Sequence, residues 1–94
     1  MTLYAVQYAY DDRSERRDEL RPEHRAYLGS LVDTGSLLSS GPWAHDPPGA
    51  LLIFSADSPA EVERLLDADP FAREGLVAAR AIREWTPVLG AWKA

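Results

Sequence analysis

The first part of the chain alternates in the way a β-strand does. Residues 3–10 combine tyrosines with apolar residues, which predicts a strand. Tyr4, Val6, Tyr8 and Tyr10 fall on one face of it, because side chains alternate across a strand. The opposite face is also only weakly polar. We therefore expect both faces of this strand to be covered.

The pattern then changes to a helical period. Residues 11–20 are mostly charged and predict a mobile loop. Pro22 suits the first turn of the helix that follows, and Gly35 suits its C-terminal cap. A stripe at helical spacing lies between these two residues and predicts the buried face of that helix. The stripe consists of His24, Tyr27, Leu28, Leu31 and Val32.

The second half of the chain predicts two more short strands, a second helix and a last long strand. Ser58 to Glu61 form a capping box with proline at the first helical position, and Pro70 ends that helix near Ala68. The remaining expected segments are a strand at 37–40, a proline-rich loop at 43–49, a strand at 50–54, a strand at 77–85, and a tail at 86–94 that adds a short edge strand.

This order predicts an α+β fold, a ferredoxin-like βαββαβ sandwich with two helices on one face of an antiparallel sheet. Residues 1–94 are expected to form a single domain. The first and third strands are apolar on both faces, yet the helices cover only one. We expect a second copy of the chain to cover the other, giving a homodimer through the sheet face.

Composition narrows the classes of function. The net charge is −5 and no basic cluster interleaves with aromatic residues, which disfavours nucleic-acid binding. Cysteine is absent and only two histidines are present, so we expect no metal site and no cofactor. No apolar run is long enough to cross a membrane, and the N-terminus looks like a strand rather than a signal peptide. We expect a cytoplasmic protein with a small-molecule ligand.

His24 is the first candidate for chemistry, because it occupies a position where a helix usually buries an apolar residue. If Pro22 is the first helical residue, the positive end of the helix dipole disfavours a protonated ring. A neutral imidazole is the form that a general base needs. The alternative is a structural histidine that fills a gap in the core, with one nitrogen bonded to backbone.

Asp69 is the second candidate. In one interpretation it caps a short turn that begins at Pro70 and ends at Gly75. In the other it holds the ring of His24, fixing its tautomer and supporting positive charge during proton transfer. The two roles are compatible, because a carboxylate has two oxygens.

A third segment follows the second strand. Its glycine allows close backbone approach and its tryptophan can wall a small cavity, although a plain turn is the simpler interpretation. Arg21 is expected either to attract an anionic group or to form a surface ion pair. The candidate substrate-binding residues are Arg21, Ser40, Gly41, Pro42, Trp43 and Phe71.

Three motifs in this order resemble the YCII-related (YciI-like) family of small dimeric α/β-barrel proteins. They are Arg21-x-x-His24-x-x-Tyr-Leu, Gly35-x-Leu-Leu-x-x-Gly41-Pro42 and Asp69-Pro70-Phe71-x-x-x-Gly75-Leu76. The resemblance implies that His24 and Asp69 form an active-site dyad. One branch of the family removes chloride from chlorinated hydroxyquinol-type aromatics, so a lyase, isomerase or dehydrochlorinase type of activity is possible.

The sequence therefore favours a small cofactor-free enzyme that uses a His-Asp dyad for proton transfer on a small polar or aromatic substrate. The alternative is a non-catalytic domain that binds a small ligand or serves as an accessory subunit. A purely structural dimeric domain is the third interpretation. A large separation between His24 and Asp69 would favour this third interpretation.

Overall fold

Strands and helices alternate along the chain in the order that the hydrophobic pattern predicts. The computed structural model describes residues 2–93. Its elements are β1 (Thr2–Tyr10), α1 (Ser14–Asp33), β2 (Leu37–Pro42), β3 (Gly49–Ala56), α2 (Pro59–Asp67), α3 (Pro70–Arg73) and β4 (Val77–Trp85). The prediction omitted only α3 as a helix, where it expected a capped turn.

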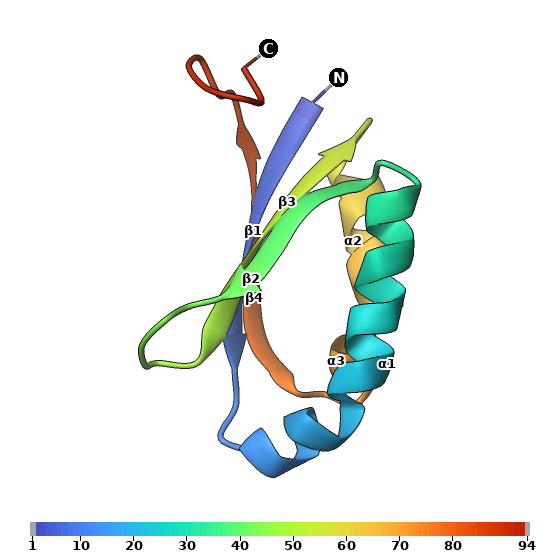
Figure 1. Cartoon of the computed structure of the whole chain (residues 1–94), viewed down its shortest axis with the longest axis vertical. Coiled ribbons are helices and arrows are strands. Elements are labelled where there is room, and N and C mark those ends of the chain that lie inside the picture. Colours follow the sequence, from blue (N-terminus) through green and yellow to red (C-terminus); the bar gives the residue numbers. More distant parts are fainter. Residues whose placement is uncertain (1, 94) are drawn as a thin grey trace.

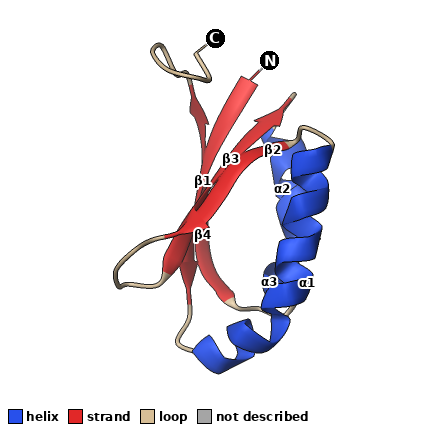
Figure 2. Ribbon diagram, viewed as in Figure 1, coloured by secondary structure: helices blue, strands red, loops and turns tan. Residues whose placement is uncertain are grey.

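The four strands form one antiparallel sheet in the order β2-β3-β1-β4. In its centre Val6 of β1 lies between Leu52 of β3 and Ile82 of β4. In the described range, residues 2–93, all three helices lie on one face of this sheet and the opposite face carries no helix (Figures 1 and 2). The ferredoxin-like α+β fold predicted from the sequence is therefore confirmed.

The core lies between the sheet and the helices. Val6, Leu52, Phe54 and Leu66 are fully buried there, because the inner face of the sheet meets the apolar sides of α1 and α2. Val32, the last residue of the predicted stripe, is instead 51% exposed. A smaller cluster of Leu20, Phe71 and Leu76 joins the start of α1 to α3.

The start of α1 corrects the sequence prediction. Residues 11–20 are not a loop along their whole length, because the helix begins at Ser14. Pro22 lies inside the helix rather than in its first turn, and the first turns run at an angle to the rest (Figure 1). A proline inside a helix removes one backbone hydrogen bond, which accounts for such a bend. His24 consequently lies near the middle of α1, away from its positive end.

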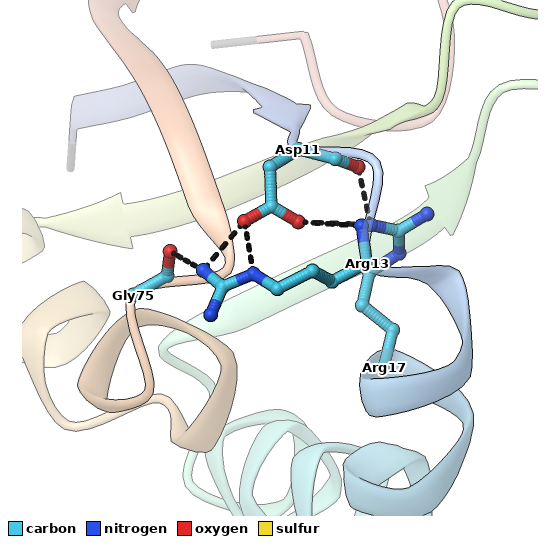
Figure 3. Close-up of polar contacts among 4 residues, drawn as sticks. All are labelled: Asp11, Arg13, Arg17 and Gly75. Carbon is cyan, nitrogen blue, oxygen red and sulfur yellow. Dashed lines mark hydrogen bonds and ion pairs between the residues drawn. The ribbon is translucent and has the colours of Figure 1, made fainter.

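Polar contacts hold this early helix start in place (Figure 3). The Asp11 carboxylate accepts hydrogen bonds from the backbone and the side chain of Arg13, at 3.0 and 2.7 Å. Arg13 also donates to the carbonyl of Gly75 at 2.7 Å, and Arg17 donates to the carbonyl of Asp11 at 2.6 Å. These contacts attach the charged segment to the loop before β4, which the local sequence pattern does not reveal.

The predicted helix caps hold, whereas β2 and β3 each run two residues past their predicted C-terminal ends. Gly35 has a φ of 84° directly after α1, a left-handed conformation that glycine adopts without strain. The Ser58 hydroxyl accepts from the backbone N–H of Glu61 at 3.2 Å, as in a capping box. The expected edge strand in the tail is wrong for residues 86–93, and residue 94 lies outside the described residues. No helix in the described range has the length and apolar character that crossing a membrane requires.

Candidate functional site

His24 and Asp69 meet, although 45 residues separate them in the chain. The Nδ1 atom of His24 lies 2.7 Å from Oδ1 of Asp69. Asp69 is completely buried, and the side chain of His24 is 12% exposed. A carboxylate can only accept a hydrogen bond, so the Nδ1 atom carries the proton in this pair. The structure thus joins the two residues that the sequence singled out.

The Asp69 carboxylate has three hydrogen-bond donors. Oδ1 accepts from His24 and from the backbone N–H of Phe71 at 3.0 Å. Oδ2 accepts from the hydroxyl of Tyr8 at 2.9 Å. No buried side-chain nitrogen or oxygen lacks a partner anywhere in residues 2–93. Burying a carboxylate is costly unless such donors compensate it, and here they do.

Local backbone structure explains how Asp69 reaches this position. It precedes Pro70, which favours extended backbone, and Asp69 has φ −64° and ψ 128°. Pro70 begins α3, and the Asp69 side chain caps that helix through the Phe71 N–H. The capping role and the histidine-holding role both occur, one carboxylate oxygen serving two donors.

Phe71 fixes the plane of the histidine ring. The two rings are stacked, with centroids 3.8 Å apart and an interplanar angle of 4°. The ring of Tyr10 packs edge-on against the Phe71 ring, with centroids 5.6 Å apart. The Arg17 guanidinium lies 4.9 Å from the Tyr10 ring centroid. The imidazole is therefore held by a hydrogen bond at one edge and by an aromatic ring on one face.

The second nitrogen of His24 is accessible. Nε2 has no hydrogen-bond partner among residues 2–93, and no buried side-chain nitrogen in that range is unpartnered. Nε2 must therefore reach the surface. With Nδ1 protonated, Nε2 carries a free lone pair. In its neutral form such a ring can act as a base at the surface, while its carboxylate partner stays out of water.

His24 lines a cleft of about 560 Å³ between α1 and strands β2 and β3. The predicted residues Arg21, Ser40, Gly41, Pro42 and Phe71 line the same cleft. Its further lining residues, which the sequence analysis did not propose, are Tyr10, Arg25, Leu28, Gly29, Val32, Leu37 and Ala50. None of the residues that line it is acidic.

Two predicted site residues differ from the rest. Trp43 is 45% exposed and does not line the cleft with His24. It lines an adjoining hollow of about 370 Å³ that shares Tyr10, Arg21 and Pro42 with the cleft. Arg21 forms an ion pair with Asp18, so the surface ion pair and the cleft position are both present.

The predicted reason for a neutral His24 is wrong. The sequence analysis relied on the positive end of a helix, and that effect fades beyond the first turn. His24 lies ten residues after Ser14, too far for it. The charge that faces the ring is instead the Asp69 carboxylate.

In residues 2–93 no group of three or more His, Asp or Glu side chains is arranged to hold a metal ion.

Tyr8 is the main contributor that sequence reasoning missed. It lies on the inner face of β1 and is 2% exposed. Burial, together with the nearby Asp69 carboxylate, raises the pKa of Tyr8 above its usual range, so its hydroxyl stays protonated and can donate. Its place on the inward face of a strand was visible in the sequence, but its contact with Asp69, 61 residues away, was not.

Comparison with known proteins gives one consistent family. The sequence model of the YCII-related domain matches residues 1–86. The protein YciI of Escherichia coli O6:H1 (strain CFT073) is 35% identical over 85 residues, covering 79% of this chain and 86% of that protein, and YciI of Shigella flexneri matches equally.

A solved structure agrees with this assignment. It is the 5-chloro-2-hydroxyhydroquinone dehydrochlorinase TftG of Burkholderia phenoliruptrix AC1100, in complex with 2,5-dihydroxybenzoquinone. Its TM-score is 0.79 at 27% sequence identity, covering 89% of this chain and 93% of TftG.

Proposed function

Because this chain belongs to the YCII-related family, we propose that it is a small enzyme in which His24 transfers protons with the support of Asp69. The observation that carries the proposal is the 2.7 Å hydrogen bond between a fully buried carboxylate and a histidine that lines a cleft. A histidine that only filled the core would not need a buried carboxylate with three donors.

In the proposed mechanism, Nε2 of His24 removes a proton from the ligand in the cleft. The resulting imidazolium is stabilised by the Asp69 carboxylate, which stays ionised and keeps the ring oriented. The imidazolium then returns the proton to the product or to water. The stacked Phe71 ring limits rotation of the imidazole, so Nε2 keeps one direction throughout.

The cleft favours a small, flat and anionic or phenolic ligand. Arg21 and Arg25 bring two guanidinium groups to its helix side, one helical turn apart, and Ser40 adds a hydroxyl on the strand side. Tyr10 and Phe71 supply aromatic surface. TftG binds a dihydroxybenzoquinone, and a flat hydroxylated ring of this kind matches the charge and shape of the cleft.

The test replaces His24 by Gln, with His45→Gln as the matched control, because His45 is the second histidine and lies in the exposed loop before β3. Chloride release from 5-chloro-2-hydroxyhydroquinone measures turnover, and calorimetry with 2,5-dihydroxybenzoquinone measures affinity. We expect His24→Gln to lower turnover by about 10²–10⁴-fold, with affinity changed only a few-fold. His45→Gln should retain turnover.

Other outcomes discriminate between functions. If the wild-type chain binds the quinone without any turnover, and His24→Gln abolishes that binding, the domain is a ligand-binding module. If neither turnover nor binding occurs, a wider set of enolisable acids and hydroxylated aromatics is screened by thermal shift, because a specific ligand raises the melting temperature. Equal activity of His24→Gln and wild type would refute the proposed role of His24.

We further propose a homodimer through the face of the sheet that carries no helix. Alternation along β1 and β4 places the side chains of Ala5, Ala79 and Ala81 on that face, and Val88 and Leu89 in the tail are 72% and 86% exposed. A second copy would cover this face. Sedimentation at micromolar concentration should show a dimer, and Ala81→Arg should give monomers. Ala26→Arg on the exposed side of α1 is the control. A wild-type chain that stays monomeric would refute the dimer.

A further inference from the structure

The hydroxyl of Tyr8 needs an explanation that packing does not provide. Tyr8 lies between Ala50 and Arg80 on the neighbouring strands and is 2% exposed. A phenylalanine would fill the same space without burying a polar group. Among residues 2–93 the hydroxyl reaches one side chain, Asp69, at 2.9 Å from Oδ2. The role of the hydroxyl therefore lies in its contact with Asp69.

The two oxygens of Asp69 are divided between different donors. Oδ1 serves His24 and the Phe71 N–H, whereas Oδ2 is bonded by Tyr8 alone among residues 2–93. Without the Tyr8 hydroxyl, Oδ2 would be a buried charged oxygen with no donor. A carboxylate in that state gains by rotating or by taking up a proton, and either change weakens its hold on the Nδ1–H of His24.

We propose that Tyr8 is a positioning residue, whose hydroxyl fixes the Asp69 carboxylate so that His24 keeps its proton on Nδ1 and its lone pair on Nε2 at the cleft. This inference rests on the proposed function, because it concerns the same base. It adds a third side chain, from β1, to the pair contributed by α1 and by the residue before α3.

The chemistry of the phenol supports this role. Burial and the adjacent carboxylate raise the pKa of Tyr8 well above its ordinary value. The group stays neutral and remains a donor across the range in which an imidazole loses its proton. Arg80, the other charged neighbour of Tyr8 across the sheet, forms its ion pair with Asp67 at 2.8 Å and leaves Asp69 to the phenol.

The test reads the tautomer of His24 directly and needs no substrate. Long-range ¹H–¹⁵N correlation of the imidazole rings, at about pH 8.5 where unperturbed imidazoles are neutral, distinguishes protonation at Nδ1 from protonation at Nε2. Only two histidines are present, so His45→Gln assigns the signals. The variant is Tyr8→Phe. The control is Tyr27→Phe, because the Tyr27 hydroxyl donates to the carbonyl of Leu65 at 2.7 Å and not to Asp69.

We expect the wild type and Tyr27→Phe to show His24 as the Nδ1–H tautomer. Tyr8→Phe should lower the ratio of Nδ1–H to Nε2–H by about 3- to 10-fold, the worth of one hydrogen bond. An unchanged ratio in a folded Tyr8→Phe would overturn the role of Tyr8 and leave the dyad intact. A wild type with the proton on Nε2 would overturn the dyad as well, so the two failures are distinguishable.

A second measurement covers the case in which Tyr8→Phe does not fold, as judged by circular dichroism. The native sequence is then labelled with 3-fluorotyrosine, whose more acidic hydroxyl is a stronger donor. The ¹⁵N resonance of the His24 Nδ1 atom should move on labelling, both in the wild type and in Tyr27→Phe. If this resonance does not move, the phenol does not act on the dyad and the inference is wrong.

Discussion

The cleft has two walls that differ in how they are held. The helix wall, formed by α1 and α3, carries His24 on a buried Asp69 and against Phe71. The strand wall, formed by the end of β2, carries Ser40, Gly41 and Pro42, all of them exposed. Charge, burial and stacking restrict the first wall, whereas the second is open to solvent.

This difference separates two tasks: carrying out chemistry on a ligand and selecting that ligand. The helix wall can accept few substitutions at His24, Asp69 and Phe71, because His24 and the Phe71 N–H share the Asp69 carboxylate as their acceptor. The strand wall can accept many, because nothing in the core depends on its side chains. We infer that the chemistry of the cleft is determined by the helix wall and that ligand choice is adjusted at the strand wall.

Asp69→Ala should give the largest effect, because it removes the common acceptor of three donors. We expect the free energy of unfolding, measured by urea denaturation, to fall by about 2–6 kcal/mol, because the Tyr8 hydroxyl and the Phe71 N–H lose their acceptor and each buried donor left unpaired costs about 1–3 kcal/mol. Asp67→Ala is the control, since its carboxylate is 68% exposed and pairs with Arg80. That change should cost less than about 1 kcal/mol. Equal losses would remove the distinction between the buried group and a surface carboxylate.

Two glycines sharpen the comparison: Gly41 lies in β2 at the strand wall, and Gly49 is the first residue of β3. A Cβ at Gly49 would lie 2.2 Å from the carbonyl oxygen of Tyr8 and 3.0 Å from the Trp43 ring, so Gly49→Ala should destabilise the fold by about 1–3 kcal/mol. A Cβ at Gly41 meets no heavy atom within 4 Å, and Gly41→Ala should stay within about 0.5 kcal/mol. Thermal denaturation of both variants measures this, and a tolerated Gly49→Ala would contradict it.

Tyr10 lies between the walls and gives a smaller, pH-dependent effect. Burial raises the pKa of Tyr10 to about 12, with Asp69 adding to the shift and Arg17 opposing it. Folding favours the neutral phenol, so its contribution is complete below about pH 10, the unfolded value, and is lost as the pH rises towards 12. Between these two pH values the free energy of unfolding should therefore fall less in Tyr10→Phe than in wild type, each measured relative to its own value at about pH 8. Urea denaturation at each pH gives these free energies. Parallel losses would contradict the shift.

Ser40→Ala should give the smallest effect on stability, within about 0.5 kcal/mol, because Ser40 is exposed at the strand wall. Its expected effect is on ligand affinity, measured by calorimetry with 2,5-dihydroxybenzoquinone. A large loss of stability in Ser40→Ala would mean that the strand wall is held as firmly as the helix wall.

The sequence indicated the contact between His24 and Asp69 better than the structure around these two residues. His24 began an apolar stripe and Asp69 preceded a proline, and both signals are local, so they could be seen without a structure. The predicted start of α1 was wrong because a proline usually occupies the first turn. Here Leu20 and Arg17 pack inward before Pro22 and extend the helix backwards.

The contribution of Tyr8 could not have been predicted in this way. An inward tyrosine on a strand is typical of any core, and its periodicity says nothing about which group its hydroxyl reaches. The partner lies 61 residues away, beyond two helices and two strands. The same limit applies to the contact of Arg13 with Gly75, because pairing across such distances is a property of the assembled fold.

The position of Asp69 at the junction of three segments also has a kinetic consequence. Its donors come from β1, from α1 and from its own short helix, so no partly assembled chain can contain the complete arrangement. The proposed activity would then appear only once all three segments have docked, and it would disappear when α3 detaches. The amide proton of Phe71 is hydrogen-bonded to the carboxylate, so its rate of exchange with deuterated solvent would report that detachment.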